Sequence, residues 1–263
     1  MSNRLSVSRY SVELPCARLR IAVVADLHNS PYSEIIKKLK EISPDIIVSP
    51  GDLFGSLADC DTPGGHLTER YIAESQRNGE GFAFLKEASK IAPVYCSVGN
   101  HEVSVSEKNR HKIASCGAIL LENSYVRLGD GIVLGGLSSG GAHGLFGRTE
   151  APALDWLSAF SRLGGVKILL CHHPEYWSEY IAPLGIELTI SGHAHGGQWR
   201  FFGRGLLAPG QGFFPRYSGG IYSERGCSLV VSRGLMPGGR IPRINNQPEL
   251  VVIETGKIKN NCP

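Results

Sequence analysis

The amino-acid sequence predicts a protein of the α/β class. Short apolar, β-branched runs alternate along the chain with segments of helical periodicity, the pattern of parallel sheets covered by helices. The first three elements, at residues 19–25, 33–42 and 45–49, follow the order strand, helix, strand, which implies parallel strands joined by a right-handed crossover. Polar side chains directly follow several strands, at the edge where α/β sheets place their functional sites.

The first strand-helix-strand unit brings two carboxylates to that edge. The first strand (LRIAVVA) is apolar enough to be buried and ends at Asp26-Leu27-His28, where the carboxylate and the imidazole share one side of an extended backbone. The helix that follows has regularly spaced apolar residues and is ended by Pro44. The second strand leads into Asp52, and because the strands are parallel, both carboxylates emerge at one edge.

The rest of the chain continues this alternation. After a loop excursion at residues 55–81, helices are expected at 82–90, 108–116, 153–163 and 177–181. Strands are expected at 93–98, 134–137, 166–171, 186–190, 229–233 and 250–253, and an ordered loop at 198–226. The chain contains no repeat or linker, so residues 1–263 are expected to form one domain with its core at about 18–255.

The composition argues against several classes of protein. Hydrophobic residues at 42% and charged residues at 19% are typical of a globular domain. A formal net charge of +3 without a run of Lys or Arg gives no strong signal for nucleic-acid binding. Seven scattered cysteines without a C-x-x-C pair favour reduced thiols. With no signal-peptide segment at the N-terminus and no apolar run of about 20 residues, we expect a cytoplasmic protein that still allows peripheral membrane contact.

Carboxylate, imidazole and amide groups gather at the ends of five expected strands. The seven candidate ligands are Asp26, His28, Asp52, Asn100, His172, His193 and His195. This mixture suits divalent Mn, Fe or Zn. Seven ligands are too many for one tetrahedral ion and are about right for two ions that share a bridging carboxylate, an arrangement suited to phosphoryl displacement.

The same residues form five short motifs in a fixed order. They are Asp26-x-His28, Gly51-Asp52, Gly99-Asn100-His101-Glu102, His172-x-Pro174 and Gly192-His193-x-His195. The set resembles the calcineurin-like metallophosphoesterase family. The extended motif GHAHGGQ, which ends at Gln198 and is followed by Ser232-Arg233-Gly234 and Pro248-Glu249, is similar to a bacterial branch often described as membrane-associated phosphoesterases. The resemblance implies a four-layer αββα sandwich, with two mixed sheets flanked by helices and the site at the sheet edge.

The resemblance also implies a role for each residue. Two divalent ions would be held, the first by Asp26, His28 and His195, the second by Asn100, His172 and His193, with Asp52 as the bridge. His101 would be catalytic and not a ligand, acting as a general acid or stabilising charge in the transition state. A metal-bridging hydroxide would attack phosphorus in line, without a phospho-enzyme.

Three further positions need comment. His172 stands two residues before Pro174, as the family ligand does, which leaves its neighbour His173 as a candidate for contact with substrate. Arg233 directly follows a strand, where it would meet a phosphate with two hydrogen bonds; an ordinary surface arginine is the alternative interpretation. Many family members carry an aspartate where this chain has Gly55. Because that aspartate is not a metal ligand in the family, its absence is expected to affect only the rigidity of the local loop.

The expected function is metal-dependent hydrolysis of a small phosphoester. Phosphodiesters and pyrophosphates come first, including nucleotide-linked and lipid-linked ones; by resemblance alone, UDP-2,3-diacylglucosamine is one candidate. A phosphomonoesterase is the alternative within the family. Two rivals belong to other classes: a non-enzymatic metal-bearing scaffold, which would usually have lost ligands, and a DNA exonuclease, which would need a basic, aromatic-lined groove.

Overall fold

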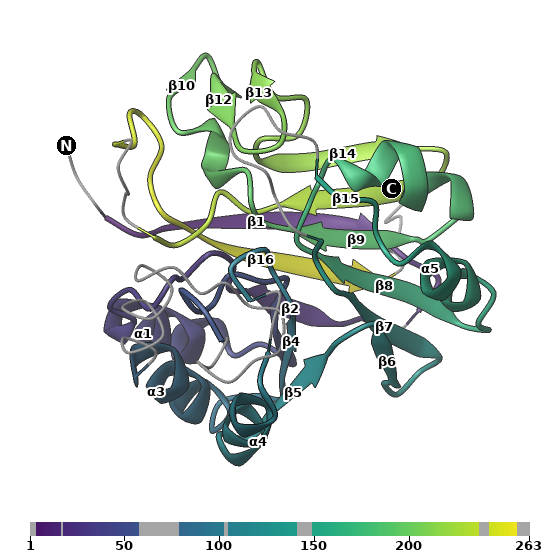
Figure 1. Ribbon diagram of the computed structural model, residues 1–263, viewed down its shortest axis with the longest axis horizontal. Helices are drawn as coiled ribbons and strands as arrows, with labels where there is room; N and C mark the ends of the chain where they lie inside the picture. Colours follow the sequence, from purple (N-terminus) through teal and green to yellow (C-terminus); the bar gives the residue numbers. More distant parts are fainter. Residues whose placement is uncertain are drawn as a thin grey trace, which may run out of the picture.

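The computed structural model describes residues 4–16, 18–57, 79–102, 105–140, 149–236 and 242–256. Two six-stranded sheets form its centre (Figure 1). The first sheet contains, in spatial order, β1 (Ser6–Glu13), β16 (Glu249–Gly256), β2 (Arg20–Val23), β3 (Ile46–Ser49), β4 (Val94–Ser97) and β5 (Ala118–Leu121). The second contains β14 (Gly220–Glu224), β15 (Cys227–Val231), β9 (Leu188–Ser191), β8 (Val166–Cys171), β7 (Ile132–Leu137) and β6 (Ser124–Arg127).

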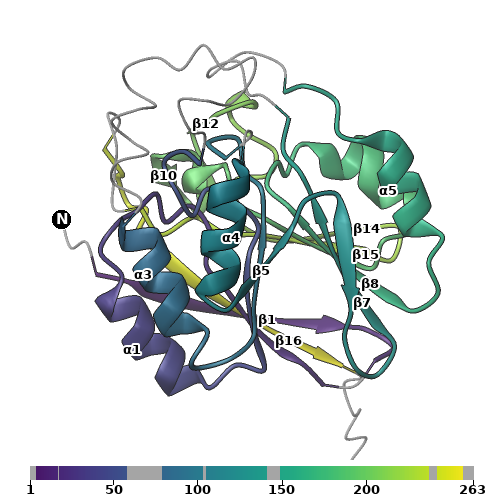
Figure 2. The same cartoon turned by 60° about the horizontal axis from the view of Figure 1, so that its bottom comes forward.

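Helices cover the outer face of each sheet (Figure 2). The helices α1 (Ser33–Ile42), α3 (Gly79–Ala88) and α4 (Glu107–Ser115) pack on the first sheet, and α5 (Leu154–Ser161) with the π-helix η1 (Trp177–Ile181) packs on the second. Three apolar clusters separate the resulting layers: one under each helical layer and one between the sheets. The protein therefore has the predicted αββα sandwich, and burial of these clusters supplies the main favourable term in its folding.

Helix α1 illustrates how the sequence determines these layers. Its buried side chains, Ile35, Ile36, Leu39 and Ile42, recur with the helical period and face the sheet. Ser43 ends the helix in a left-handed conformation, and its N–H donates to the carbonyl of Leu39 at 3.0 Å. This helix has the predicted bounds.

The parallel strands of both sheets end at the same side of the molecule. In the first sheet β2, β3, β4 and β5 are parallel, and in the second β7, β8, β9 and β15 are parallel. Each sheet also contains antiparallel pairs, β16 with β2 and β14 with β15 among them, so both sheets are mixed. The carboxyl ends of five of the parallel strands carry the loops with the candidate ligands, as predicted.

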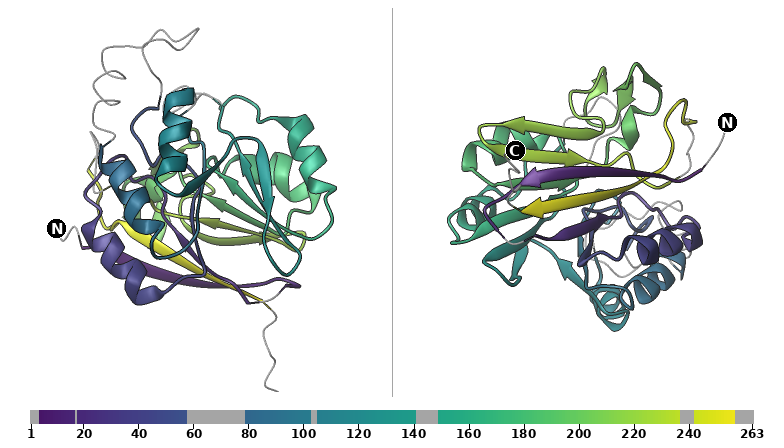
Figure 3. Two further views of the ribbon diagram at one scale, coloured as in Figure 1. Left: turned by 90° about the horizontal axis from the view of Figure 1, so that it is seen from below. Right: turned by 180° about the vertical axis from the view of Figure 1, so that it is seen from behind.

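Two parts of the chain differ from the sequence-based expectation. Strand β1 was not predicted, because its inward positions include Ser6 and Ser8 and its apolar alternation is therefore weak. Residues 198–226, expected as a loop, form two small hairpins and the edge strand β14. The hairpins are β10 (Arg200–Phe201) with β11 (Arg204–Gly205) and β12 (Leu207–Ala208) with β13 (Gly212–Phe213), and they project together from one end of the sandwich (Figure 3).

Most of the predicted loop excursion lies outside the described residues, since residues 58–78 are not described. Helix α3 begins at Gly79, within the range assigned to that loop. Among the described helices, none combines the length and the apolar character that crossing a bilayer requires.

Candidate metal centre

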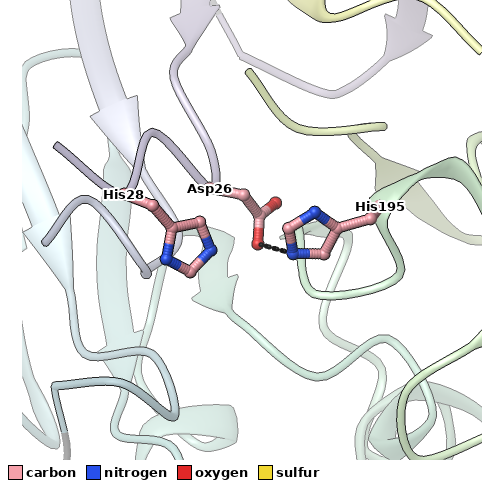
Figure 4. Close-up of side chains that lie close together, drawn as sticks. All are labelled: Asp26, His28 and His195. Atoms are coloured by element: carbon pink, nitrogen blue, oxygen red, sulfur yellow. Dashed lines mark ion pairs between the residues drawn. The ribbon is translucent and has the colours of Figure 1, made fainter. Parts of the chain in front are cut away.

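The loops after β2, β3, β4, β8 and β9 bring the seven candidate ligands together. The first group consists of Asp26, His28 and His195, whose potential ligand atoms all lie within 4.8 Å of one another (Figure 4). Nε2 of His195 lies 3.5 Å from Oδ1 of Asp26, and Asp26 is fully buried. Figure 4 shows these three side chains converging from the loop after β2 and from the turn after β9.

The second group consists of Asp52, His172 and His193, again with ligand atoms within 4.8 Å of one another. Nε2 of His172 lies 3.2 Å from Oδ2 of Asp52 and 3.0 Å from Oδ1 of Asn100. The two histidines of the turn after β9 are thus divided between the groups, His195 in the first and His193 in the second.

Asp52 stands between the groups. Its Oδ2 lies 3.2 Å from Nε2 of His172 in the second group and 3.6 Å from Nε2 of His28 in the first. Its Oδ1 accepts the backbone N–H of His101 at 2.9 Å. One carboxylate oxygen is therefore close to imidazoles from both groups.

The chemistry of the donor set fits divalent cations. Several buried polar atoms of the candidate ligands have no hydrogen-bond partner among the described residues: Asp26 Oδ2, His28 Nε2, His172 Nδ1, His193 Nε2 and His195 Nδ1. Unpaired buried polar atoms are costly in a protein interior. A cluster of them that combines carboxylate and imidazole is what a metal site requires.

Burial and mutual interaction hold four of the candidate ligands in the form that binds a cation. Burial lowers the pKa of His28 to about 4 and holds the pKa of His193 and His195 well below the usual range, so their imidazoles are neutral. Burial opposes ionisation of Asp52, but the neighbouring His172 and His101 hold its pKa well below the usual range. Neutral imidazole and ionised carboxylate are the ligating forms.

The backbone at these ligands adopts an unusual conformation. Five of the seven candidate ligands have positive φ angles, namely Asp26 at 50°, His28 at 46°, Asp52 at 54°, His193 at 64° and His195 at 45°. Left-handed conformations are uncommon outside glycine and cost about 1–3 kcal/mol when they are strained. Their concentration at one point of the fold is typical of a functional site.

Close backbone contacts hold the loops in this arrangement. A Cβ atom added to Gly192 would lie 2.6 Å from Oδ2 of Asp26, and one added to Gly99 would lie 2.2 Å from Oδ1 of Asp52. The buried carboxylate of Glu102 accepts three backbone N–H groups, from Asp52 at 3.0 Å, Phe54 at 2.9 Å and Gly99 at 2.9 Å. Glu102 therefore joins the loop after β3 to the loop after β4.

His101 lies at the same centre. Its ring stands 4.7 Å from that of His28, centroid to centroid, and a grouping of possible ligand atoms includes it with His28 and Asp52. Its Nδ1 lies 3.2 Å from the carbonyl oxygen of Gly55. The backbone of Gly55, where many family members carry an aspartate, thus contacts the candidate catalytic imidazole.

The two candidate substrate-binding residues are both engaged with neighbouring carboxylates. His173 is fully buried, with Nδ1 3.2 Å from Oε1 of Glu175 and its ring 4.2 Å from that of His193. Arg233 pairs with the buried Glu249, Nη2 to Oε1 at 2.9 Å, and donates to Oγ of Ser6 at 3.0 Å. A role in substrate binding stays a prediction for both.

Sequence analysis missed Arg243, which lies beside the first ligand group. Its Nε and Nη1 are shielded from solvent and have no hydrogen-bond partner among the described residues. Burial is the main cause of the low pKa of His28 and His195, and the charge of Arg243 lowers it further; the same charge opposes the rise that burial causes in the pKa of Asp26. The last of the five motifs ends at His195, and the segment containing Arg243 has no helical or strand periodicity. The sequence around Arg243 therefore gave no sign that this residue lies at the site.

Known proteins resemble this chain over most of its length. The family model described as calcineurin-like phosphoesterase matches residues 19–197. A protein of Aquifex aeolicus (strain VF5), named an uncharacterized metallophosphoesterase, is 27% identical over 269 residues, which cover 98% of this chain and 94% of that protein. One crystal structure shares the fold with a TM-score of 0.53 at 12% identity, covering 81% of this chain and 90% of its own. The crystal structure of TT1561 of Thermus thermophilus gives a TM-score of 0.47 at 14% identity, covering 84% and 92%.

Proposed function

The chain belongs to the calcineurin-like phosphoesterase family and is a metal-dependent phosphoesterase, and from this premise we propose that it hydrolyses phosphodiesters or pyrophosphates at a centre of two divalent metal ions. The observation that carries the proposal is the division of the buried ligands into two groups that both approach Asp52. A single ion bound by one group would leave unpaired buried atoms in the other group.

The ligands are assigned from the two groups. Asp26, His28 and His195 hold the first ion, and Asn100, His172 and His193 hold the second. Asp52 would serve both ions, because its Oδ2 lies within 4 Å of an imidazole from each group. Mn, Fe and Zn all suit this mixture of nitrogen and oxygen ligands.

The reaction consumes water and forms no covalent enzyme intermediate. When bound, the two ions would lower the pKa of a water molecule and neutralise charge on the phosphoryl group. Water oxygen forms a bond to phosphorus as the bond to the leaving oxygen breaks, so a diester yields a monoester and an alcohol. His101 supplies the proton or the positive hydrogen-bond donor at the leaving oxygen, with its ring oriented by the Gly55 carbonyl.

Metal analysis followed by turnover tests the proposal. Purified protein should contain two divalent ions per chain and should hydrolyse bis(p-nitrophenyl) phosphate, and a chelator should abolish this activity until Mn²⁺ or Zn²⁺ is restored. Parallel assays with p-nitrophenyl phosphate and with a nucleoside diphosphate ester rank monoester and pyrophosphate substrates. A protein that binds two ions and hydrolyses none of the three substrates would instead be a metal-bearing scaffold.

A further inference from the structure

The guanidinium of Arg243 lies beside the candidate metal centre, largely shielded from solvent, and no carboxylate of the described residues forms an ion pair with it. Its Nε and Nη1 have no hydrogen-bond partner among the described residues, and Nη2 makes one long hydrogen bond, 3.4 Å to the carbonyl oxygen of Gly234. Burial lowers the pKa of Arg243 to about 10, opposed by Asp26 and Glu249, so the side chain is still charged at neutral pH. A buried, unpaired charge is destabilising unless something binds it.

Arg233 provides the contrast, because its charge is paired with a buried carboxylate. Its guanidinium pairs with Glu249 at 2.9 Å and donates to Ser6 at 3.0 Å, and its backbone N–H donates to the same carboxylate at 2.9 Å. Glu249 also accepts the hydroxyl of Ser8. Of these two arginines, Arg233 forms an ion pair with a carboxylate, whereas Arg243 forms none with the described residues and has two buried donors without a hydrogen-bond partner among them.

Arg243 is close to the first ligand group. Gly234, which accepts its hydrogen bond, packs against Asp26 so tightly that an added Cβ would lie 2.9 Å from Cβ of that aspartate. The next two backbone N–H groups bind the same strand end, Leu235 to the carbonyl of Ala25 at 3.0 Å and Met236 to that of Asp26 at 2.9 Å. The head of Arg243 therefore reaches the loop that carries Asp26.

The segment around Arg243 is fixed to the turn that carries His195. Pro242 accepts Nε1–H of Trp199 at 3.0 Å, and Ile244 exchanges two backbone hydrogen bonds, with Arg200 at 2.9 Å and Gln198 at 3.2 Å. Nδ2 of Asn246 donates to the carbonyl of His195 at 2.7 Å. Hydrogen bonds thus fix the residues on both sides of Arg243, so its side chain is already positioned before a ligand binds.

We propose that Arg243 binds a non-bridging oxygen of the substrate phosphate on the Asp26, His28 and His195 side of the metal centre. This inference rests on the proposed function and names a substrate-binding residue for it. The free Nε–H and Nη1–H groups match the oxygens of a tetrahedral oxyanion, and guanidinium is well suited to phosphate. The phosphate compensates the buried charge that the fold leaves unpaired.

The direct test is the binding of inorganic phosphate to the metal-loaded protein by calorimetry. Arg243→Met keeps the length of the apolar stem and removes the donors, and it should weaken phosphate binding about 10- to 100-fold, the loss expected for a hydrogen-bonded charge. Arg243→Lys should recover part of the affinity. Metal content, measured on the same samples, should stay at the wild-type value. Arg204→Met, at an exposed position of β11, is the matched control and should bind phosphate as the wild type does.

A stability measurement separates substrate binding from a structural role. Because Arg243 is unpaired, Arg243→Met should unfold at the wild-type temperature or above it in phosphate-free buffer, whereas Arg233→Met should unfold at a lower temperature, because it leaves Glu249 buried without its partner. The proposal is overturned if phosphate affinity in Arg243→Met stays within twofold of wild type. It is equally overturned if Arg233→Met, correctly folded, shows the loss of affinity instead.

The steady-state assay distinguishes this failure from failure of the proposed function. If wild-type protein turns over the diester and binds phosphate, but Arg243→Met has unchanged KM and unchanged phosphate affinity, Arg243 is not the phosphate ligand and the phosphoesterase proposal stands. If wild-type protein binds neither phosphate nor metal, the proposed function fails first. With both proposals correct, KM for the diester rises in Arg243→Met in parallel with the weaker phosphate binding.

Discussion

At the scale of single residues, the positive φ angles distinguish ligands from their neighbours. Asp26, His28, Asp52, His193 and His195 all have left-handed backbone, although each follows a regular strand closely in sequence. Leu27, between two of them, is an ordinary fully buried core residue. The turns therefore direct polar side chains to the centre and apolar ones to the core, at a conformational cost offset by the surrounding packing.

His101→Ala should lower kcat without removing metal. Because His101 is assigned to the leaving oxygen and not to an ion, the loss should be about 10²- to 10⁴-fold, the usual contribution of general acid catalysis. Metal content by atomic emission should remain that of the wild type. His111→Ala, at an exposed position of α4, is the control and should leave kcat unchanged. Full activity in His101→Ala would refute the assignment.

Metal binding should release a proton from His172 at neutral pH. Burial alone would lower its pKa, but the carboxylates of Asp52, Asp26 and Glu102 raise it to about 9, so the metal-free imidazole is protonated at pH 7.5 and must lose that proton to ligate. Metal affinity should therefore increase with pH up to about 9. Below pH 6 it should fall more steeply, because burial raises the pKa of Asp26 to about 6.

Calorimetric titration of metal-free protein with Zn²⁺ in buffers of different ionisation enthalpy measures this linkage. The slope of observed enthalpy against buffer ionisation enthalpy should give at least one proton released at pH 7.5, because His172 contributes one in addition to any proton lost by metal-bound water. Release of no protons at that pH would show that His172 is neutral in the metal-free protein.

At the scale of elements, Glu102 connects two strand ends that are not joined by sequence. Its carboxylate accepts backbone N–H groups from Asp52, Phe54 and Gly99, and so fixes the loop after β3 against the loop after β4. Burial, together with the nearby charge of Asp52, raises its pKa to about 7. The residue belongs to the Gly99–Glu102 motif, but its role as the joint between two loops is visible only in three dimensions.

Glu102→Ala should destabilise the metal-free protein by about 3 kcal/mol, because three buried N–H groups lose their acceptor. Glu102→Gln should recover part of this loss through its remaining carbonyl oxygen. Urea unfolding monitored by circular dichroism gives the free energies. Glu107→Ala, at an exposed position of α4, is the matched control and should change stability by less than about 0.5 kcal/mol. Equal stabilities of the Ala variants at 102 and 107 would contradict the role of Glu102.

Which elements were predicted depended on how much apolar surface each buries. Helix α1 was predicted to the residue, because four of its side chains enter the core with a regular period. The hairpins β10–β11 and β12–β13 were not, since strands of two residues contain no period, and β1 was missed because serines occupy part of its inner face. Local patterns report burial, and these elements are fixed mainly by hydrogen bonds to distant parts of the chain.

The site itself was predicted from motifs as far as those motifs extend. The five motifs end at His195, so they carried no information about the segment at residues 242–246. That segment returns to the site through contacts with Trp199, Arg200 and His195. Arg233 was predicted to bind substrate only because it follows a strand. Its pairing with Glu249 depends on strand β16, 16 residues away in sequence, and could not be read locally.

At the scale of the whole molecule, the candidate ligands come from both sheets. Asp26, His28, Asp52 and Asn100 follow strands of the first sheet, whereas His172, His193 and His195 follow strands of the second. Each ligand group combines residues from both sheets. Metal ions bound there would join the two sheets at the edge formed by the carboxyl ends of the parallel strands. The apolar cluster between the sheets joins them as well.

Removal of metal should therefore lower the stability of the whole sandwich. An ion that binds only the folded state stabilises it by about 2.7 kcal/mol at 100 times its dissociation constant, so the melting temperature should rise by several degrees as Zn²⁺ or Mn²⁺ is titrated into chelator-treated protein. Asp52→Asn, from the first sheet, and His193→Ala, from the second, should each weaken this metal-dependent rise, whereas His111→Ala should retain it in full. Scanning calorimetry should show one transition that moves as a unit, because the ligands join both sheets. A metal-dependent shift confined to a separate partial transition would show that the ions stabilise only the loops, and an unchanged melting temperature would contradict metal binding at this centre.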